Sequence, residues 1–274
     1  MPIEQLLTLA IVQGLTEFLP VSSSGHLNLV HLLTRWEDQG PLMDVAVHVG
    51  SLVAVLVYFW RDVLALLAGL GNLLRGKLTP EARLLLLLIL ATLPLLNIGY
   101  LVVKSGLLTD LRTLAVIAWA NLGFAVLLWA ADTVGLTIRR IDHTSVFDAI
   151  MIGIAQVFSI IPGASRAGVT MTMARFLGFE RPDAARLSML LSIPAILALG
   201  LATGLEVYSS GNLALQEGAI IAGGLSCITA LLSIWLMMAL MRRTTMFIFV
   251  AYRFVLGALL LAVVYGFIPL AHAG

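Results

Sequence analysis

The chain has 274 residues, of which 60% are hydrophobic and only 11% are charged, and its mean hydropathy is +1.03. A soluble domain of this length would carry about 25% charged residues, so the composition excludes a water-covered globular surface. The formal net charge is +1, and the sequence contains no basic stripe suited to nucleic acid. The one cysteine, Cys227, lies in an apolar run, which excludes a disulfide framework and a cysteine metal site.

Runs of about 20 apolar residues predict membrane-spanning helices. Six such runs lie at 42–60, 84–103, 112–134, 185–205, 218–241 and 247–268. Residues 61–83 carry several charges and are expected to lie at the membrane interface. The N-terminal MPIEQ contains no Lys or Arg, which argues against a cleaved signal peptide.

Two further apolar segments, 3–34 and 146–177, are interrupted by polar residues. Each has the form of a helix, a polar turn with proline and glycine, and a short helix. Non-helical backbone survives at membrane depth only where it is buried in protein or lines a wet cavity. We therefore predict that both segments are re-entrant hairpins.

The two halves of the chain share one order of elements, a hairpin followed by three spans. We predict a single membrane domain, 1–274, built from a first repeat, 1–138, and a second repeat, 139–274. The matched residues are Gln13, Pro20 and Ser23 in the first half and Gln156, Pro162 and Ser165 in the second. Because each repeat crosses three times, its second copy would insert upside down as an inverted-topology repeat. The predicted class is an all-α integral membrane protein with about six transmembrane helices plus two re-entrant helical hairpins.

The placement of basic residues predicts the orientation. With the N-terminus outside, eleven Lys and Arg residues fall on the cytoplasmic side and three on the outer side, a clear positive-inside bias. The cytoplasmic set is Arg61, Arg75, Lys77, Arg83, Arg139, Arg140, Arg175, Arg181, Arg186, Arg242 and Arg243, and the outer set is Arg35, Lys104 and Arg112. Arg166 and Arg253 remain, and both lie in segments that are expected to be embedded.

A charge at the centre of a spanning helix costs about 2.5–3.5 kcal/mol, so embedded polar residues need a reason. The candidates are Gln13, Glu17, Ser22, Ser23, Ser24, His26, Asp44, His48, Gln156, Ser165, Arg166, Thr170 and Arg253. Gln13 and Glu17 are four residues apart and share one helix face. They could hold a divalent cation or orient a histidine, and a hydrogen-bonded plug between helices is the alternative.

The two polar turns carry groups that suit an anionic oxyacid. In SSSGH, exposed N–H groups at a helix start and hydroxyls attract phosphate oxygens, and His26 can exchange a proton near neutral pH. In PGASRAGVT, Arg166 offers a planar donor fork, and Thr170 follows on the same helical side. The alternatives are an ordinary serine-rich cap and a salt bridge from Arg166 to Glu17 that only joins the hairpins.

Three embedded residues are ambiguous. Arg253 is as consistent with snorkelling to the cytoplasmic interface as with a place in the site. Asp44 suits a helix N-terminal acid at least as well as a catalytic group. His48 lies one turn further and within reach of the site, although we expect it to be a packed core histidine.

These motifs resemble the bacitracin-resistance family of undecaprenyl-pyrophosphate phosphatases over essentially the whole chain. The matching stretches are QGLTEFLPVSSSGH at 13–26, DVAVHVGSLVAVLVYFWR at 44–61, PGASRAGVT at 162–170 and AYRF at 251–254. The resemblance implies hydrolysis of a polyprenyl pyrophosphate to the monophosphate plus inorganic phosphate, which recycles the lipid carrier for cell-wall synthesis and confers bacitracin resistance. It implies a multi-pass protein of the bacterial plasma (inner) membrane whose active site opens to the outer face. Bacitracin is then expected to compete for the lipid rather than bind the protein, and a homodimer is left open.

The resemblance also assigns residues. The family's catalytic positions fall on Glu17, Ser23, His26 and Arg166, and substrate-binding positions on Gln13, Ser22, Ser165, Thr170 and Arg253. A divalent cation, Mg²⁺ or Ca²⁺, would lie on Glu17 with help from Gln13. The chain departs from the family's pattern at Ala167, often a serine, and has Gln13 where a glutamate is common.

In the working hypothesis, Ser23 or a water attacks the β-phosphorus while His26 exchanges the proton; histidine attack is also left open. A secondary transporter or flippase for a phosphorylated lipid or small anion is the alternative, because inverted repeats with broken helices also hold anions in carriers. A second class of membrane lipid phosphatase uses KxxxxxxRP, PSGH and SRxxxxxHxxxD. We reject it because no KxxxxxxRP precedes SSSGH and residue 172 is a threonine.

Overall fold

The computed structural model describes residues 2–34, 36, 40–135, 137–209 and 213–268. Within these ranges the chain is built from helices and contains no β-strand, and one isolated bridge pairs Arg139 with Phe179. The α-helices are α1 (Ile3–Thr16), α2 (Ser23–Thr34), α3 (Gly40–Tyr58), α4 (Trp60–Leu74), α5 (Pro80–Ser105), α6 (Leu107–Leu111), α7 (Leu114–Val134), α8 (Val146–Val157), α9 (Arg166–Phe176), α10 (Arg181–Ser209), α11 (Leu213–Met241) and α12 (Phe247–Val264). Two 3₁₀ turns, η1 (Ile141–His143) and η2 (Phe158–Ile160), complete the described elements.

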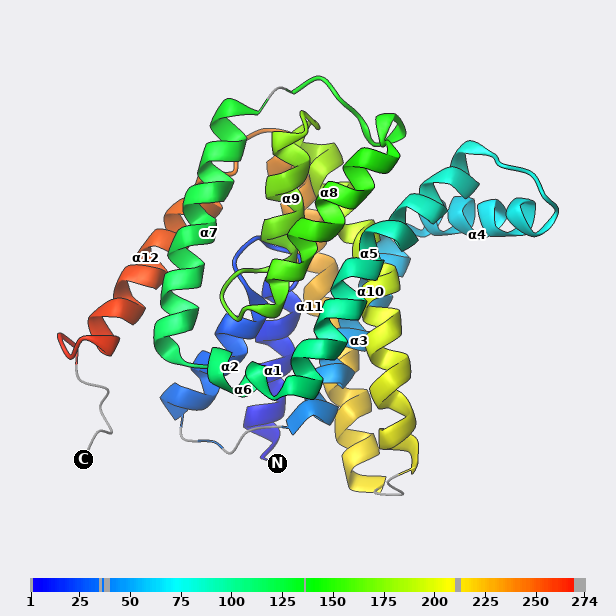
Figure 1. Ribbon diagram of the computed structural model, residues 1–274. Coiled ribbons are helices and arrows are strands. Elements are labelled where there is room, and N and C mark those ends of the chain that lie inside the picture. Colours follow the sequence, from blue (N-terminus) through cyan, green and yellow to red (C-terminus); the bar gives the residue numbers. More distant parts are fainter. Residues whose placement is uncertain (1, 35, 37–39, 136, 210–212, 269–274) are drawn as a thin grey trace.

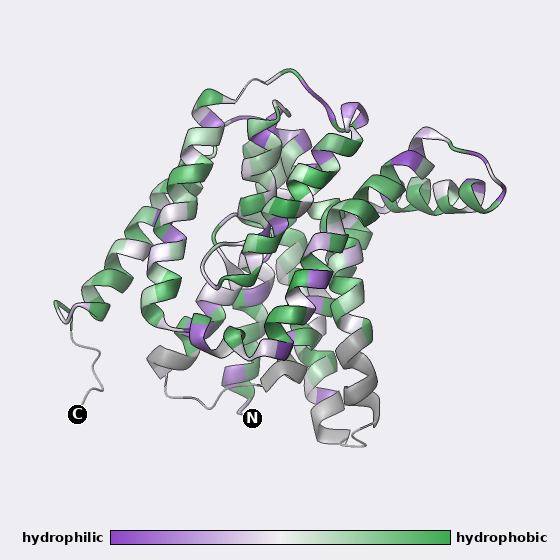
Figure 2. Ribbon diagram, in the orientation of Figure 1, coloured by the Kyte–Doolittle hydropathy of each residue, from purple (hydrophilic) through white to green (hydrophobic). Residues whose placement is uncertain are grey.

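Five helices, α5, α7, α10, α11 and α12, are long and apolar enough to cross a membrane. Helices α3 and α4 pass the same test together but meet at a bend of 88°, so the described residues hold up to six spans. In Figure 2 the described parts of these helices are coloured mostly as hydrophobic. The protein is a multi-pass, all-α membrane protein, which confirms the predicted fold class. Its division into two inverted repeats stays a prediction.

The bend between α3 and α4 lies at Phe59, whose backbone leaves the helical region at φ −98° and ψ 32°. Beyond it, α4 and the start of α5 project sideways as an arm (Figure 1). The arm is held together where Gly69 packs on the backbone of Glu81 and Ala82, because a Cβ at Gly69 would lie 2.6 Å from the Ala82 nitrogen. The sequence predicted only an interfacial stretch at 61–83. In the structure, α4 makes up the first half of that stretch.

The connections lie at two ends of the bundle. Figure 1 shows the α4–α5 arm and the end of α7 toward one end, and the start of α1, the end of α10 and the start of α11 toward the other. Most residues of the basic set expected on the cytoplasmic side belong to the first end. Of the outer set, Arg35 lies outside the described residues. The grouping is consistent with the orientation deduced from charge, which remains a prediction.

The long helices pack closely through small residues. Helix α11 lies against both α1 and α3, α12 lies against α7, and α5 lies against α8. At the α3–α11 contact, a Cβ on Gly50 would lie only 2.0 Å from the carbonyl oxygen of Gly223. Association of membrane helices depends on such close approach, because lipid is as apolar as the side chains.

The two interrupted segments form the centre of the molecule. Helix α1 ends at Thr16 and α2 starts at Ser23, while α8 and η2 lead to a turn before α9 starts at Arg166. Both turns lie at mid-height in the bundle (Figure 1). The structure thus places two irregular turns, each between helices, inside the protein rather than against lipid.

Candidate active site

The two central turns share one backbone geometry. Ser22 and Ser165 each stand one residue before the second helix and have positive φ values of 74° and 72°. In each turn the serine Oγ accepts a hydrogen bond from a glycine N–H three residues later: Gly25 to Ser22 at 3.3 Å and Gly168 to Ser165 at 3.1 Å. Residues with a side chain rarely adopt this conformation, so these contacts fix the start of α2 and α9.

This geometry corrects the register matched from the sequence. Ser165 corresponds in local structure to Ser22 and not to Ser23, because Ser22 has the positive φ and the capping contact. With this register, Gln13 and Gln156 each precede the capping serine by nine residues. The residue that follows the serine is Ser23 in one turn and Arg166 in the other.

The turns also bind each other. Ser22 Oγ accepts from the Gly163 N–H at 3.1 Å, and Ser165 Oγ donates to the Leu19 carbonyl at 3.5 Å. The two contacts differ because Gly163 corresponds to Pro20 in the first turn. Proline has no N–H to donate, so Ser165 bonds to the carbonyl of the preceding residue, Leu19. These bonds bring the N-terminal starts of α2 and α9 together, where first-turn N–H groups lack intrahelical acceptors and attract anions.

Arg253 on α12 ties the turns together. It is 0% exposed, and its guanidinium donates to the carbonyls of Pro20 at 3.2 Å, Gly163 at 2.8 Å and Ala164 at 3.2 Å. Its Nε donates to the Asn121 carbonyl, and the Asn121 amide donates to the Arg253 carbonyl. Snorkelling to the interface is therefore wrong for this residue. We interpret Arg253 as a residue that positions both turns.

Glu17 is the centre of the polar cluster and is only 7% exposed. Its Oε1 accepts from Arg166 Nη2 at 2.9 Å, which joins the two turns by an ion pair. Its Oε2 accepts from Ser23 Oγ at 2.7 Å and from Gln13 Nε2 at 2.9 Å. A buried carboxylate is stable only when paired and hydrogen-bonded, and these donors satisfy that need.

His48 faces the same carboxylate. Its Nδ1–H donates to the Asp44 carbonyl at 2.6 Å, which turns Nε2 toward Glu17 Oε2 at 3.6 Å. The side chain is 21% exposed, so it is not the packed core histidine that we expected. Asp44 lies one turn earlier on α3, where its backbone carbonyl orients the imidazole.

His26 lies beside the cluster but bonds elsewhere. Its Nδ1–H donates to the Ser22 carbonyl at 2.6 Å, so the neutral ring accepts at Nε2 from the Tyr252 hydroxyl, also at 2.6 Å. The two rings are stacked with centroids 5.8 Å apart. Within the described part of the chain, no hydrogen bond joins His26 to Ser23 or Arg166. The structure thus places His26 at the edge of the cluster.

The other candidates support the turns. Thr170 is 1% exposed, and its hydroxyl lies 2.6 Å from Ser188 Oγ, while Arg166 Nη1 donates to the Ser188 carbonyl at 3.3 Å. Ser24 Oγ lies 3.3 Å from Ser22 Oγ. Gln156 is fully buried and its amide donates to the Ala91 carbonyl at 3.4 Å, away from Glu17.

Three contributors were missed in the sequence. Tyr252 stands beside Arg253 in the quoted AYRF, Ser188 lies in α10, and Asn121 lies in α7. A polar residue inside an apolar span is the signal that would have marked Asn121. No local pattern would have paired Tyr252 with a histidine 226 residues away.

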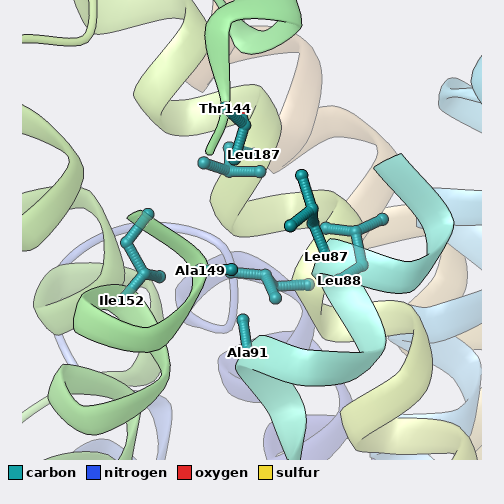
Figure 3. A pocket seen from close by; sticks show the side chains of 8 residues that line it. Leu87, Leu88, Ala91, Thr144, Ala149, Ile152 and Leu187 are labelled. Carbon is teal, nitrogen blue, oxygen red and sulfur yellow. The ribbon is translucent and has the colours of Figure 1, made fainter. Parts of the chain in front are cut away.

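A hollow between α5, α8 and α10 is not the site. Figure 3 shows Leu87, Leu88, Ala91, Ala149 and Ile152 lining it, with Thr144 and Leu187 at one side. Its volume of about 10 Å³ is that of a single water, and its walls are almost entirely apolar. A phosphate group requires charged partners, which the Glu17–Arg166 cluster provides and this hollow does not.

The residues around Glu17 offer oxygen ligands of the kind that a divalent cation needs. The described ranges contain no group of three or more His, Cys, Asp or Glu side chains that could hold a metal ion. However, Gln13 Oε1 is buried without a hydrogen-bond partner, next to the Glu17 carboxylate. Mg²⁺ binds proteins through one or two carboxylates and completes its shell with waters and substrate phosphates. One carboxylate and one unpartnered amide oxygen fit that mode.

The arrangement can perform phosphoryl chemistry. It offers a hydroxyl (Ser23) bonded to a carboxylate (Glu17), a fixed cation (Arg166) and two helix starts. Phosphoryl transfer requires mostly positioning and neutralisation of phosphate oxygens. The same groups would also hold a phosphate without cleaving it, so geometry alone leaves the activity to further evidence.

Comparison with known proteins supplies that evidence. The family model described as "Bacitracin resistance protein BacA" matches residues 6–259. This chain belongs to the BacA family.

Within the family, the chain is 46% identical to the "Undecaprenyl-diphosphatase" of Jannaschia sp. (strain CCS1) over 95% of this chain and 98% of that protein. It is 47% identical to the protein of the same name from Ruegeria pomeroyi over 97% of this chain and 100% of that protein. It is 45% identical to "Undecaprenyl-diphosphatase 1" of Rhodospirillum rubrum, over 95% of each chain. The expected BacA membership is confirmed.

Proposed function

We propose that this protein hydrolyses undecaprenyl diphosphate to undecaprenyl phosphate and inorganic phosphate, as the names of its BacA relatives state for them. It is an enzyme, a lipid diphosphatase, and its activity returns the lipid carrier to cell-wall synthesis. The observation that carries the proposal is the contact of Ser23 and Arg166 with the two oxygens of one buried carboxylate, Glu17.

The diphosphate binds where the two turns meet. Arg166 offers its planar fork to the terminal phosphate, and the first-turn N–H groups of α2 and α9 bind the remaining oxygens. Arg253 does not touch substrate in this proposal. It holds Pro20, Gly163 and Ala164 so that the two helix starts converge. The isoprenoid tail lies in the hydrocarbon between the helices.

Ser23 is the proposed nucleophile. Its hydroxyl already donates to Glu17 Oε2 at 2.7 Å, so the carboxylate is placed to take the proton as the serine oxygen bonds to the terminal phosphorus. The bond from that phosphorus to the bridging oxygen breaks, and undecaprenyl phosphate leaves with both electrons of the bond. This differs from the hypothesis made from sequence, in which His26 took the proton.

A second step restores the enzyme. A water attacks the phosphorus bound to Ser23, gives a proton to a base, and the serine oxygen leaves and takes up the proton held by Glu17. His48 and His26 both lie at the cluster as candidate bases, with His48 Nε2 nearer to Glu17. Inorganic phosphate is then released. Direct attack by water on the diphosphate gives the same products without the phosphoserine.

Glu17 and Gln13 are the residues that we propose for a divalent cation, Mg²⁺ or Ca²⁺, through the carboxylate and the unpartnered Oε1. Such a cation would neutralise phosphate oxygens. In this proposal Ser22, Ser165 and Thr170 hold the turns in place and do not contact the substrate. Their hydroxyls are hydrogen-bonded to the backbone or to Ser188.

The proposed location is the bacterial plasma (inner) membrane, with the site reached from the outer face. The positive-inside bias of the connections supports this orientation. Bacitracin is proposed to compete for the lipid diphosphate rather than to bind the protein, and a homodimer is the proposed assembly.

Release of inorganic phosphate from purified protein tests the proposal. Undecaprenyl diphosphate and farnesyl diphosphate are compared in detergent, with and without chelator. We expect release from the wild type and strong loss in Arg166→Ala. A protein that binds the lipid diphosphate but releases no phosphate would instead support the transporter or flippase alternative, which the names of the relatives do not favour.

A further inference from the structure

A second hollow lies at the elbow between α3 and α4, away from the Glu17 cluster. It has a volume of about 350 Å³, and its lining is mostly polar. The bend itself provides one wall through Phe59 and Trp60. Arg186 of α10 and Arg242, which directly follows the last residue of α11, provide the other. The hollow therefore forms where a span leaves the bundle and the chain turns by 88°.

The charge of this hollow is positive. Arg61, Arg186 and Arg242 line it together with a single acid, Asp62. Arg186 is paired with Asp62 by a hydrogen-bonded ion pair, so these two charges offset each other. Arg61 stacks its guanidinium over the Trp60 ring at 5.2 Å, and Arg242 is exposed. Two arginine charges thus remain for an anion of about the size of a phosphate headgroup.

Helix α4, which adjoins the hollow, has an exposed apolar face. Trp60, Leu64, Leu67 and Leu74 are exposed, and their spacing of four, three and seven residues places them on one face of α4. The opposite face, which includes Leu66 and Gly69, is buried against α5. An interfacial helix of this kind lies in the membrane plane with its apolar face toward acyl chains.

We propose that the elbow hollow binds the phosphate group of an anionic phospholipid, whose acyl chains lie along the exposed face of α4. Basic pockets between membrane helices bind such headgroups, and each arginine near the surface strengthens binding. All three arginines belong to the set assigned to the cytoplasmic side, which is the leaflet side opposite the proposed opening of the catalytic site. The ligand is therefore a resident lipid, not the substrate.

Native mass spectrometry of the purified full chain tests the proposal. Delipidated protein is titrated in detergent with phosphatidylglycerol or with phosphatidylcholine of the same acyl chains, and the bound lipid is counted. Arg242→Gln and Arg61→Gln are compared with Arg243→Gln, an exposed neighbour outside the lining that carries the same charge change. We expect about fivefold weaker phosphatidylglycerol binding in each hollow variant, and no change in Arg243→Gln.

Three results would overturn the proposal. The first is equal binding of the two lipids by the wild type, and the second is an equal loss in Arg242→Gln and Arg243→Gln. The third is displacement of phosphatidylglycerol by inorganic phosphate at millimolar concentration, which would make the hollow a free-phosphate site. Phosphate release from undecaprenyl diphosphate is measured on the same variants and stays at the wild-type level, since none of these arginines contacts the Glu17 cluster. A failure here is thereby distinguished from a failure of the proposed function.

Discussion

Ser22 and Ser165 occupy the same position in two turns that lie far apart in sequence, and each caps the following helix with φ above 70°. The scaffold of the two turns is therefore alike, but the next residue differs. It is Ser23 in the first turn and Arg166 in the second, and both contact Glu17. The first turn thus brings the hydroxyl and the second brings the cation, and we propose that cleavage requires both.

Substitutions of the three neighbouring serines, Ser22, Ser23 and Ser24, are expected to have different effects on activity and stability. Ser23→Ala removes the hydroxyl bonded to Glu17, so phosphate release should fall by about three orders of magnitude or more, with little change in thermal stability. Ser24→Ala is the control and should retain activity. Ser22→Ala removes acceptors for the Gly25 and Gly163 N–H groups and leaves an alanine at φ 74°, so it should lower stability by about 1–3 kcal/mol.

Detergent thermal unfolding and a phosphate assay on the same samples check this separation. Near-wild-type activity in Ser23→Ala would eliminate the phosphoserine route. It would leave direct attack by water as the mechanism, with Glu17 still the base.

Arg253 is expected to stabilise the two turns and not to contact the substrate. Arg253→Gln removes donors to carbonyls of both turns, so we expect a loss of about 2 kcal/mol or more in stability. Arg253→Lys keeps the charge but not the planar fork, and should recover only part of that stability. Thermal unfolding midpoints in detergent measure both effects, with Arg243→Gln as the control. Full stability with lost activity would instead place Arg253 on the substrate.

Much of the fold could be predicted because its signals are local. A run of apolar residues is sufficient to place α5, α7 and α10 to α12, and a glutamate and an arginine inside apolar segments were sufficient to mark Glu17 and Arg166. The charges that begin at Arg61 marked the end of the span at residue 60, but not the sharp bend at Phe59, since VYFWR contains neither proline nor glycine.

The partners within the site were harder to predict than its members. His26 and Tyr252, or Arg253 and Gly163, meet only because distant helices pack together. The proline spacing also suggested that Ser23 matches Ser165, and this register was wrong by one residue. The register follows from the backbone, because the capping serine is the residue with positive φ. In a run of three serines, the sequence does not show which one adopts that conformation.

The α3–α11 contact should depend on the absence of a side chain at Gly50. Gly50→Ala would place a Cβ 2.0 Å from the Gly223 carbonyl oxygen, so the helices must separate, at a loss of about 1–3 kcal/mol. Gly224→Ala is the matched control, because a Cβ there meets nothing within 4 Å and alanine favours the helix by about 0.5–1 kcal/mol. Thermal unfolding should therefore move in opposite directions. Equal midpoints would show that the two helices are not in close contact.

The Glu17–Arg166 ion pair can be tested for a role beyond joining the turns. Glu17→Gln or Arg166→Gln alone leaves a buried charge without its partner, which should lower stability by about 3–5 kcal/mol. The double variant has no unpaired charge and should regain part of that stability. Phosphate release should nevertheless be lost in all three, because each variant lacks the base, the phosphate-binding cation or both.

Arg139 and Asp148 form the matched control pair, with Nη2 and Oδ2 2.5 Å apart and away from the cluster. Arg139→Gln with Asp148→Asn should change stability but leave phosphate release per folded molecule intact. Recovery of phosphate release together with stability in the Glu17→Gln, Arg166→Gln double variant would contradict the proposed chemistry. It would mean that the pair only joins one turn to the other. Cleavage of the diphosphate would then be carried out by other groups at the cluster, such as His48, whose Nε2 lies 3.6 Å from Glu17 Oε2.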